Sequence, residues 1–157
     1  MDIKSIKLLR IGALVLGWIL LITVFLVVLI RITAIAEFGY ISVLSYFFSG
    51  LGNVFLAFLV AAVLRMIEKE APVGNKNARR LMIACCLSYL ADAIVRSCAF
   101  ILSLPDIMHF FDRPDWVSLL PNAYIGLPPF APFLYAASIF ILFTHFSKMV
   151  TFESEVA

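Results

Sequence analysis

Asp92 and Arg96 are the side chains of this chain whose types and spacing could do chemistry. They lie four residues apart, one helical turn, inside an apolar run of residues 81–104. Ionisable groups within such a run are costly and commonly belong to proton relays, ion paths or polar ligand sites. The two charges could instead neutralise each other and specify which helix faces meet. We prefer this structural interpretation, because a transport path usually needs more titratable groups than one Asp.

Other hydrogen-bonding residues fall at a similar depth when each apolar run is drawn as a helix. Asp92 and Asn53 each lie twelve residues from the outer end of their run, which is about 18 Å at 1.5 Å per residue. Thr23 falls in the same zone. We therefore predict one intramembrane polar layer to which four helices contribute. Its members are Asp92, Arg96, Asn53, Ser49, Ser88, Tyr89 and Ser138, with Thr23 from the first run.

Motifs for catalysis or metal binding are absent from the sequence. His109 and His145 have no Cys, Asp or Glu at metal-ligand spacing. Cys85, Cys86 and Cys98 form no C-x-x-C pattern and are typical of small buried apolar residues. No hydrolase, zinc-protease or phosphate-loop signature is present. We expect a protein that is not an enzyme and that holds no metal and no cofactor.

The elements that must position the polar layer are apolar runs of membrane-spanning length. The chain is 64% hydrophobic, whereas soluble domains are roughly 45–50% apolar. A hydrocarbon core about 30 Å thick needs about 20 helical residues. Four segments meet this requirement, at about 11–30, 41–64, 81–104 and 132–150. They predict an all-α fold, a single four-helix transmembrane bundle over residues 1–157.

The basic residues are distributed unevenly between the two sides of the predicted bundle. Nine lie on the side of the chain ends, against Arg31 and Arg113 on the other. This asymmetry predicts an inner-membrane protein with both termini in the cytoplasm. The basic side is expected to contact lipid headgroups and no nucleic acid. The residues of its link between the second and third runs, the predicted basic face, are Arg65, Lys69, Lys76, Arg79 and Arg80.

The second run carries a ridge of small and partly polar residues at four-residue spacing. Small residues at this spacing let two helix backbones approach closely. The ridge therefore predicts a packing seam, although the same residues could line a narrow polar cavity. Its members are Ser45, Ser49, Asn53, Ala57 and Ala61, flanked by Gly50 and Gly52.

The connection between the third and fourth runs is the longest, at residues 105–129. Pro105 is expected to end the third helix, because proline cannot continue regular helical hydrogen bonding. Trp116 and Tyr124 lie among acidic and aliphatic residues in this connection. The composition predicts an amphipathic loop in the outer membrane interface. Pro132 is expected in the first turn of the last helix.

Three stretches carry a resemblance to a known family. The link begins L-R-M-I-E-K-E at residues 64–70, and N-K-N-A-R-R-L at 75–81 leads into the third run. Residues 143–155 form an aromatic and aliphatic segment that runs into a short acidic tail. This order of parts resembles a bacterial family of uncharacterised four-helix inner-membrane proteins, catalogued as a domain of unknown function. Its members are often encoded beside a Cro/CI-type repressor, so the resemblance implies a regulatory or sensory role.

Two functions from different classes remain open on the sequence. The first is a non-enzymatic membrane protein that binds a partner, either another membrane protein or a cytoplasmic regulatory protein. The second is a small transporter or channel subunit that uses the polar site of Asp92, Arg96 and Asn53 at the midplane.

Overall fold

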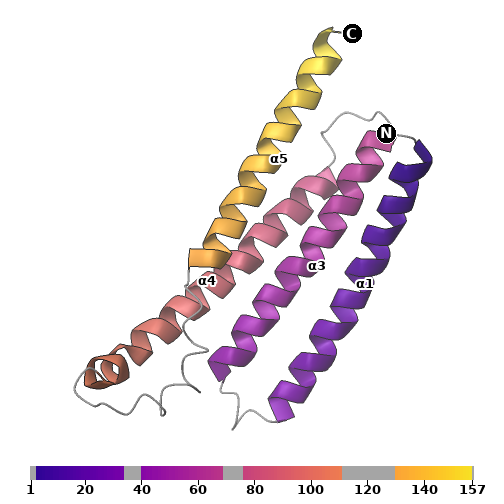
Figure 1. Ribbon diagram of the computed structural model, residues 1–157. Coiled ribbons are helices and arrows are strands. Elements are labelled where there is room, and N and C mark those ends of the chain that lie inside the picture. The colour runs from indigo at the N-terminus through magenta and orange to yellow at the C-terminus, as the bar shows by residue number, and fades with distance from the viewer. Residues whose placement is uncertain (1–2, 34–39, 69–75, 111–129, 157) are drawn as a thin grey trace.

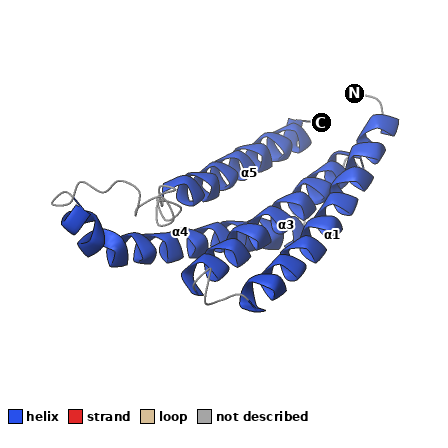
Figure 2. Cartoon of the chain, turned by 60° about the horizontal axis from the view of Figure 1, so that its bottom comes forward, coloured by secondary structure: helices blue, strands red, loops and turns tan. Residues whose placement is uncertain are grey.

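The fold is a series of long helices, as the apolar runs predict. The computed structural model describes residues 3–33, 40–68, 76–110 and 130–156 (Figure 1). All of these are helical, in α1 (Ile3–Thr33), α3 (Tyr40–Glu68), α4 (Lys76–Phe110) and α5 (Phe130–Val156). The main contacts join α1 to α3, α3 to α4 and α4 to α5 (Figure 2). Each helix thus packs chiefly on its neighbour in the chain, and the main contacts close no ring.

Three helices are long and apolar enough to cross a membrane. They are α1, α3 and the part of α4 from Lys76 to Cys98. Only 11% of the most apolar stretch of α1 is buried inside the structure, so most of this stretch faces outward. The described apolar part of α5, Ala131–His145, is shorter. At 1.5 Å per residue it measures about 22 Å, less than a full hydrocarbon core.

α1 packs on α3 along one narrow seam. A Cβ added to Gly17 would lie 2.9 Å from the ring of Phe58, and one on Gly50 would lie 2.5 Å from Cγ2 of Val24. Such distances are too short for real Cβ atoms, so both glycines are required for the observed approach. In a bilayer, lipid tails are as apolar as these side chains, so close packing and polar contacts, rather than the hydrophobic effect, hold such helices together.

α3 and α4 are in close contact at Gly52. A Cβ on Gly52 would lie 2.9 Å from the Tyr89 ring, and Sγ of Cys85 donates to the Gly52 carbonyl over 3.4 Å. Ala57 and Ala61 are buried, as predicted for the ridge on this helix. Close contacts also lie at Gly50, toward α1, and at Gly52, toward α4, which flank that ridge.

Among the described residues, the main contacts of α5 are with the half of α4 that lies nearer Lys76. Sγ of Cys86 donates to the Ala136 carbonyl over 3.5 Å, and the rings of Tyr89 and Tyr135 lie 5.8 Å apart. Phe130, the first residue of α5, precedes Ala136 by six residues, or about 9 Å. α5 therefore begins near the middle of α4 rather than at its far end (Figure 1).

The prediction that Pro105 ends the third helix is wrong. α4 continues through this residue to Phe110, because proline removes one backbone donor and one helical hydrogen bond while neighbouring bonds can persist around a kink. The last turns of α4 leave the line of the rest of the helix (Figure 2). The remainder of the predicted interfacial loop, residues 111–129, lies outside the described residues. Pro132 lies in the first turn of α5, as predicted.

An ion pair joins the start of α1 to the end of α3. Nη1 of Arg10 donates to Oε2 of Glu68 over 2.5 Å, and Nζ of Lys7 lies 3.9 Å from Oε1. The Glu68 side chain is 12% exposed, against 55% for Lys7. Arg10 is therefore the stronger partner.

Glu68→Gln is expected to lower the free energy of unfolding by about 1 kcal/mol, because it removes a short charge-assisted bond at a partly exposed site. Denaturant unfolding in mixed micelles measures the effect. The matched control is Lys7→Gln, which removes the longer and more exposed contact and is expected to change stability by less than about 0.5 kcal/mol. Equal losses in the two variants would contradict the ranking.

Candidate functional site

The Asp92 carboxylate lies at the centre of the polar contacts between α3 and α4. It is completely buried. Nε of Arg96 lies 3.0 Å from both carboxylate oxygens, and the Ser45 hydroxyl donates to Oδ1 over 2.5 Å. A buried carboxylate needs such a counter-charge and donors to offset its lost hydration. The second partner of Asp92 is thus Ser45 and not Ser49, which lies one turn further along α3.

A second polar contact lies further along the same two helices. The Tyr89 hydroxyl donates to Oδ1 of Asn53 over 2.7 Å. Tyr89 is 5% exposed, held between Gly52 on α3 and Tyr135 on α5. Buried tyrosines usually find a partner for the hydroxyl, and this bond fixes the Asn53 side chain by its oxygen.

The other predicted members of the polar layer do not join these contacts. Hydroxyls of Ser88 and Thr23 donate to carbonyls of their own helices, Ala84 at 2.9 Å and Ile19 at 2.8 Å. Ser138 is exposed on α5. It lies two residues from Ala136, whose carbonyl is the partner of Cys86. Cys86 precedes Arg96 by ten residues on α4, which is about 15 Å along the helix. Among the described residues, the contacts of the predicted polar layer therefore join α3 to α4 only. Thr23 bonds within α1, and Ser138 is kept apart because α5 is displaced along α4.

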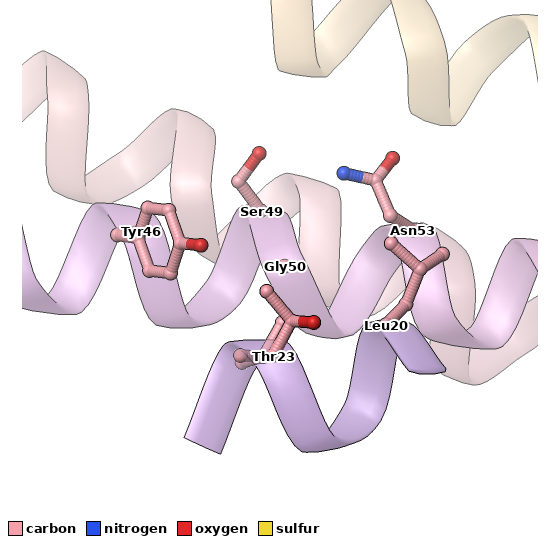
Figure 3. A pocket seen from close by; sticks show the side chains of 7 residues that line it. Leu20, Thr23, Tyr46, Ser49, Gly50 and Asn53 are labelled. Atoms are coloured by element: carbon pink, nitrogen blue, oxygen red, sulfur yellow. The ribbon is translucent and has the colours of Figure 1, made fainter. Parts of the chain in front are cut away.

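A pocket of about 120 Å³ lies between α1 and α3. Figure 3 shows that the Ser49 and Asn53 side chains point to the same side of α3. Asp92 is not among the residues that line it. The lining residues are Leu20, Thr23, Val24, Tyr46, Ser49, Gly50 and Asn53.

The polar residues of this pocket lie near the predicted midplane. Leu20 lines the pocket with Asn53, and it lies ten residues from Ile30, the end of the apolar run of α1. Ten helical residues measure about 15 Å, half of a hydrocarbon core. Asn53 is nevertheless exposed. Among the residues that the structure describes, neither its amide nitrogen nor the Ser49 hydroxyl has a hydrogen-bond partner.

One contact at the opposite end of the helices was not predicted from the sequence. Nη1 of Arg31 donates to the Ser42 hydroxyl over 3.1 Å, and its guanidinium carbon lies 4.7 Å from the centre of the Tyr46 ring. The signal was available, since Ser42 and Tyr46 lie four residues apart on the face that Ser49 and Asn53 continue. A polar stripe thus runs along α3 from its first turn to Asn53.

The residues of the predicted basic face lie at the end of the molecule where α1 and α4 begin (Figure 1). Those that the structure describes are exposed, whereas Lys69 lies outside the described residues. Arg31 lies at the opposite end of α1, so the helices carry the charge asymmetry that the sequence indicates. The exposed members are Arg65, Lys76, Arg79 and Arg80.

The arrangement offers polar contacts rather than reactive groups. Within the described ranges, no three His, Cys, Asp or Glu side chains are placed to hold a metal ion. Cys85, Cys86 and Cys98 form no disulfide. Comparisons with known protein families, curated proteins and solved structures find no match.

Proposed function

We propose that this chain is a non-enzymatic, multi-pass inner-membrane protein that binds another protein within the bilayer and serves as a regulatory or sensory subunit. The observation that carries the proposal is a pair of polar side chains on one face of α3, the half-buried Ser49 and the exposed Asn53. Both side chains lie at membrane depth on α3 without a partner for the Ser49 hydroxyl or the Asn53 amide among the described residues.

Polar groups in the hydrocarbon core of a bilayer need hydrogen-bond partners from protein. The bilayer core supplies no water to these groups, so an unpartnered amide or hydroxyl there costs several kcal/mol. A helix of a bound protein can offer acceptors for the Ser49 hydroxyl and the Asn53 amide N–H. Interhelical hydrogen bonds of this type are a common means of association in membranes.

The orientation follows from the charge asymmetry. The positive-inside rule places the end with the basic face in the cytoplasm, together with both termini. There the exposed Arg65, Lys76, Arg79 and Arg80 can contact anionic lipid and a cytoplasmic regulatory protein. The resemblance to proteins encoded beside a repressor agrees with such a regulatory role.

Photo-crosslinking in native membranes tests the protein-binding proposal. A photoreactive residue at Val60, seven residues from Asn53 on the same face of α3, is expected to form covalent adducts with protein. The same residue at Ile22 of α1 is the control and is expected to label lipid only. Val60 and Ile22 are 44% and 59% exposed, so accessibility does not explain a difference in favour of Val60. Protein adducts that are equally rare at both positions would overturn the proposal.

The polar stripe of α3 also favours a second candidate, a small transporter or channel subunit. Ser42, Ser49 and Asn53 could line a path from the far end of α3 to the midplane. Against this, Asp92 is fully buried and lies outside the pocket. Solute uptake into proteoliposomes that disappears in Asp92→Asn, while the variant remains folded, would favour transport.

A further inference from the structure

The level of Asp92 along α3 follows from its hydrogen bond to Ser45. α4 runs antiparallel to α3, because Cys85, which precedes Asp92, contacts the later residue Gly52. Ser45 lies four residues from Ile41, the first residue of the apolar run of α3, or about 6 Å. Asp92 therefore lies closer to the boundary of the apolar layer than its place in the run of α4 predicts.

Arg96 lies still closer to this boundary. It follows Asp92 by four residues on α4, which takes its backbone about 6 Å further, to the level of Ile41. Its Nε is held 3.0 Å from both oxygens of Asp92, so the guanidinium group lies near these two levels. Arg31, in the last turn of α1, contacts Ser42 of α3 at the same end of the helices. This end therefore carries two guanidinium groups near the boundary between the apolar runs and the headgroup layer.

The terminal nitrogens of Arg96 have hydrogen-bonding capacity that the described residues leave unused. Its Nε is engaged with Asp92, whereas Nη1 and Nη2 donate to none of the described residues. Neither nitrogen is buried, since the one buried and unpartnered side-chain nitrogen or oxygen of the described ranges is Nε of Arg10. The Arg96 side chain is 21% exposed. It thus presents an accessible pair of parallel donors, which matches two oxygens of one phosphate group.

We propose that Nη1 and Nη2 of Arg96 bind the phosphate group of a membrane phospholipid, in the leaflet at the end of the molecule where α3 begins. A cation at this depth needs an anionic partner, because hydrocarbon supplies none. Lipid phosphates lie just outside the hydrocarbon layer, and local thinning of the bilayer brings them inward to buried arginines. Asp92 holds the guanidinium group through Nε, so the donor pair is oriented before the lipid binds. Inorganic phosphate offers the same oxygens but would have to leave water to reach this level.

Lipid titration of the purified full chain, followed by native mass spectrometry, tests the site. The chain is released from micelles that contain phosphatidylglycerol, and the bound fraction gives the affinity of the most tightly held lipid. Arg96→Lys is expected to weaken this binding at least about tenfold, because lysine keeps a charge beside Asp92 but lacks the donor pair. Arg80→Lys is the matched control, with the same substitution at an exposed residue of the same helix. It is expected to change the affinity by less than about twofold.

Two further titrations identify the ligand. A galactosyl diacylglycerol with the same acyl chains has no phosphate and is expected to bind the wild type at least about tenfold more weakly. Inorganic phosphate is expected to leave the bound phospholipid in place. If Arg96→Lys does not fold, the double variant Asp92→Asn with Arg96→Gln takes its place, since it carries no buried charge and also lacks the donor pair.

Equal phospholipid affinity in the wild type and the Arg96 variant would overturn the site, and so would equal losses in Arg96→Lys and Arg80→Lys. Equally tight binding of the glycolipid, or displacement of the lipid by inorganic phosphate, would overturn a phospholipid as the ligand. This inference goes beyond the proposed function, because it requires α3 and α4 to cross a bilayer but no protein bound to α3. The crosslink from Val60 tests protein binding separately, so either proposal can fail while the other stands.

Discussion

Arg96→Gln alone is expected to lower the free energy of unfolding by about 3–5 kcal/mol, because it leaves the carboxylate of Asp92 buried without a counter-charge. Asp92 is 0% exposed and too short to reach the surface. Asp92→Asn is expected to be less damaging, since the Arg96 side chain is 21% exposed and long enough to move its charge outward. The double variant, Asp92→Asn with Arg96→Gln, is expected to be more stable than Arg96→Gln alone. No buried charge remains in it, and Ser45 can still donate to the amide oxygen of the new Asn side chain.

Unfolding in mixed micelles measures all three variants, and a double-mutant cycle gives the coupling between the two positions. Ser97→Ala serves as the control, because this hydroxyl only donates to the Ala93 carbonyl of its own helix. Its stability is expected to stay within about 0.5 kcal/mol of the wild type. Additive losses in the double variant would contradict a coupled ion pair.

Gly50→Ala is expected to lower the free energy of unfolding by about 1–3 kcal/mol, the usual effect of inserting a methyl group into a well-packed contact. The added carbon would lie 2.5 Å from Cγ2 of Val24, so either the Val24 side chain or the two helices must shift. Adding Val24→Ala to this variant is expected to restore part of the loss, since it removes the clashing atoms.

Gly12 provides the control for this substitution. It lies on the same pair of helices, and a Cβ there would meet nothing within 4 Å. Gly12→Ala is expected to be neutral or to stabilise α1 by up to about 1 kcal/mol, because alanine favours helix more than glycine does. If thermal unfolding shows Gly12→Ala to be no more stable than Gly50→Ala, the loss of stability comes from the substitution within a helix and not from the contact with Val24.

The helices could be predicted from the sequence because an apolar run between charged ends needs no tertiary contact to interpret. Residues 11–30 predict α1, which extends from Ile3 to Thr33. Helical hydrogen bonding continues beyond the hydrocarbon layer, so hydropathy alone places the ends too far inward. Pro105 shows the same difficulty, since a local rule predicts an end where the helix continues.

The polar contacts could be predicted in part. Asp92 and Arg96 meet because both lie on one helix at fixed spacing. The choice of Ser45 over Ser49 depends on the rotation of α3 against α4, since residues four apart differ by about 40° around the axis. Contacts such as that of Gly52 with Tyr89 define this rotation. Whether Ser138 lies beside Asp92 and Arg96 depends on how far α5 is displaced along α4. No periodicity in the sequence determines that displacement.

The proposed function requires α1, α3 and α4 to cross a bilayer with Asn53 near its centre, and the depth of α1 tests this most directly. Nitroxide labels at Ile11, Ile19 and Ile30 report depth from their relative collision rates with oxygen and a water-soluble nickel complex. The three positions are 53%, 55% and 63% exposed, so burial in the protein does not distort the comparison. We predict the greatest depth at Ile19 and shallow values at Ile11 and Ile30. Equal depths at all three positions, or ready access of the nickel complex to Ile19, would contradict a membrane-spanning α1.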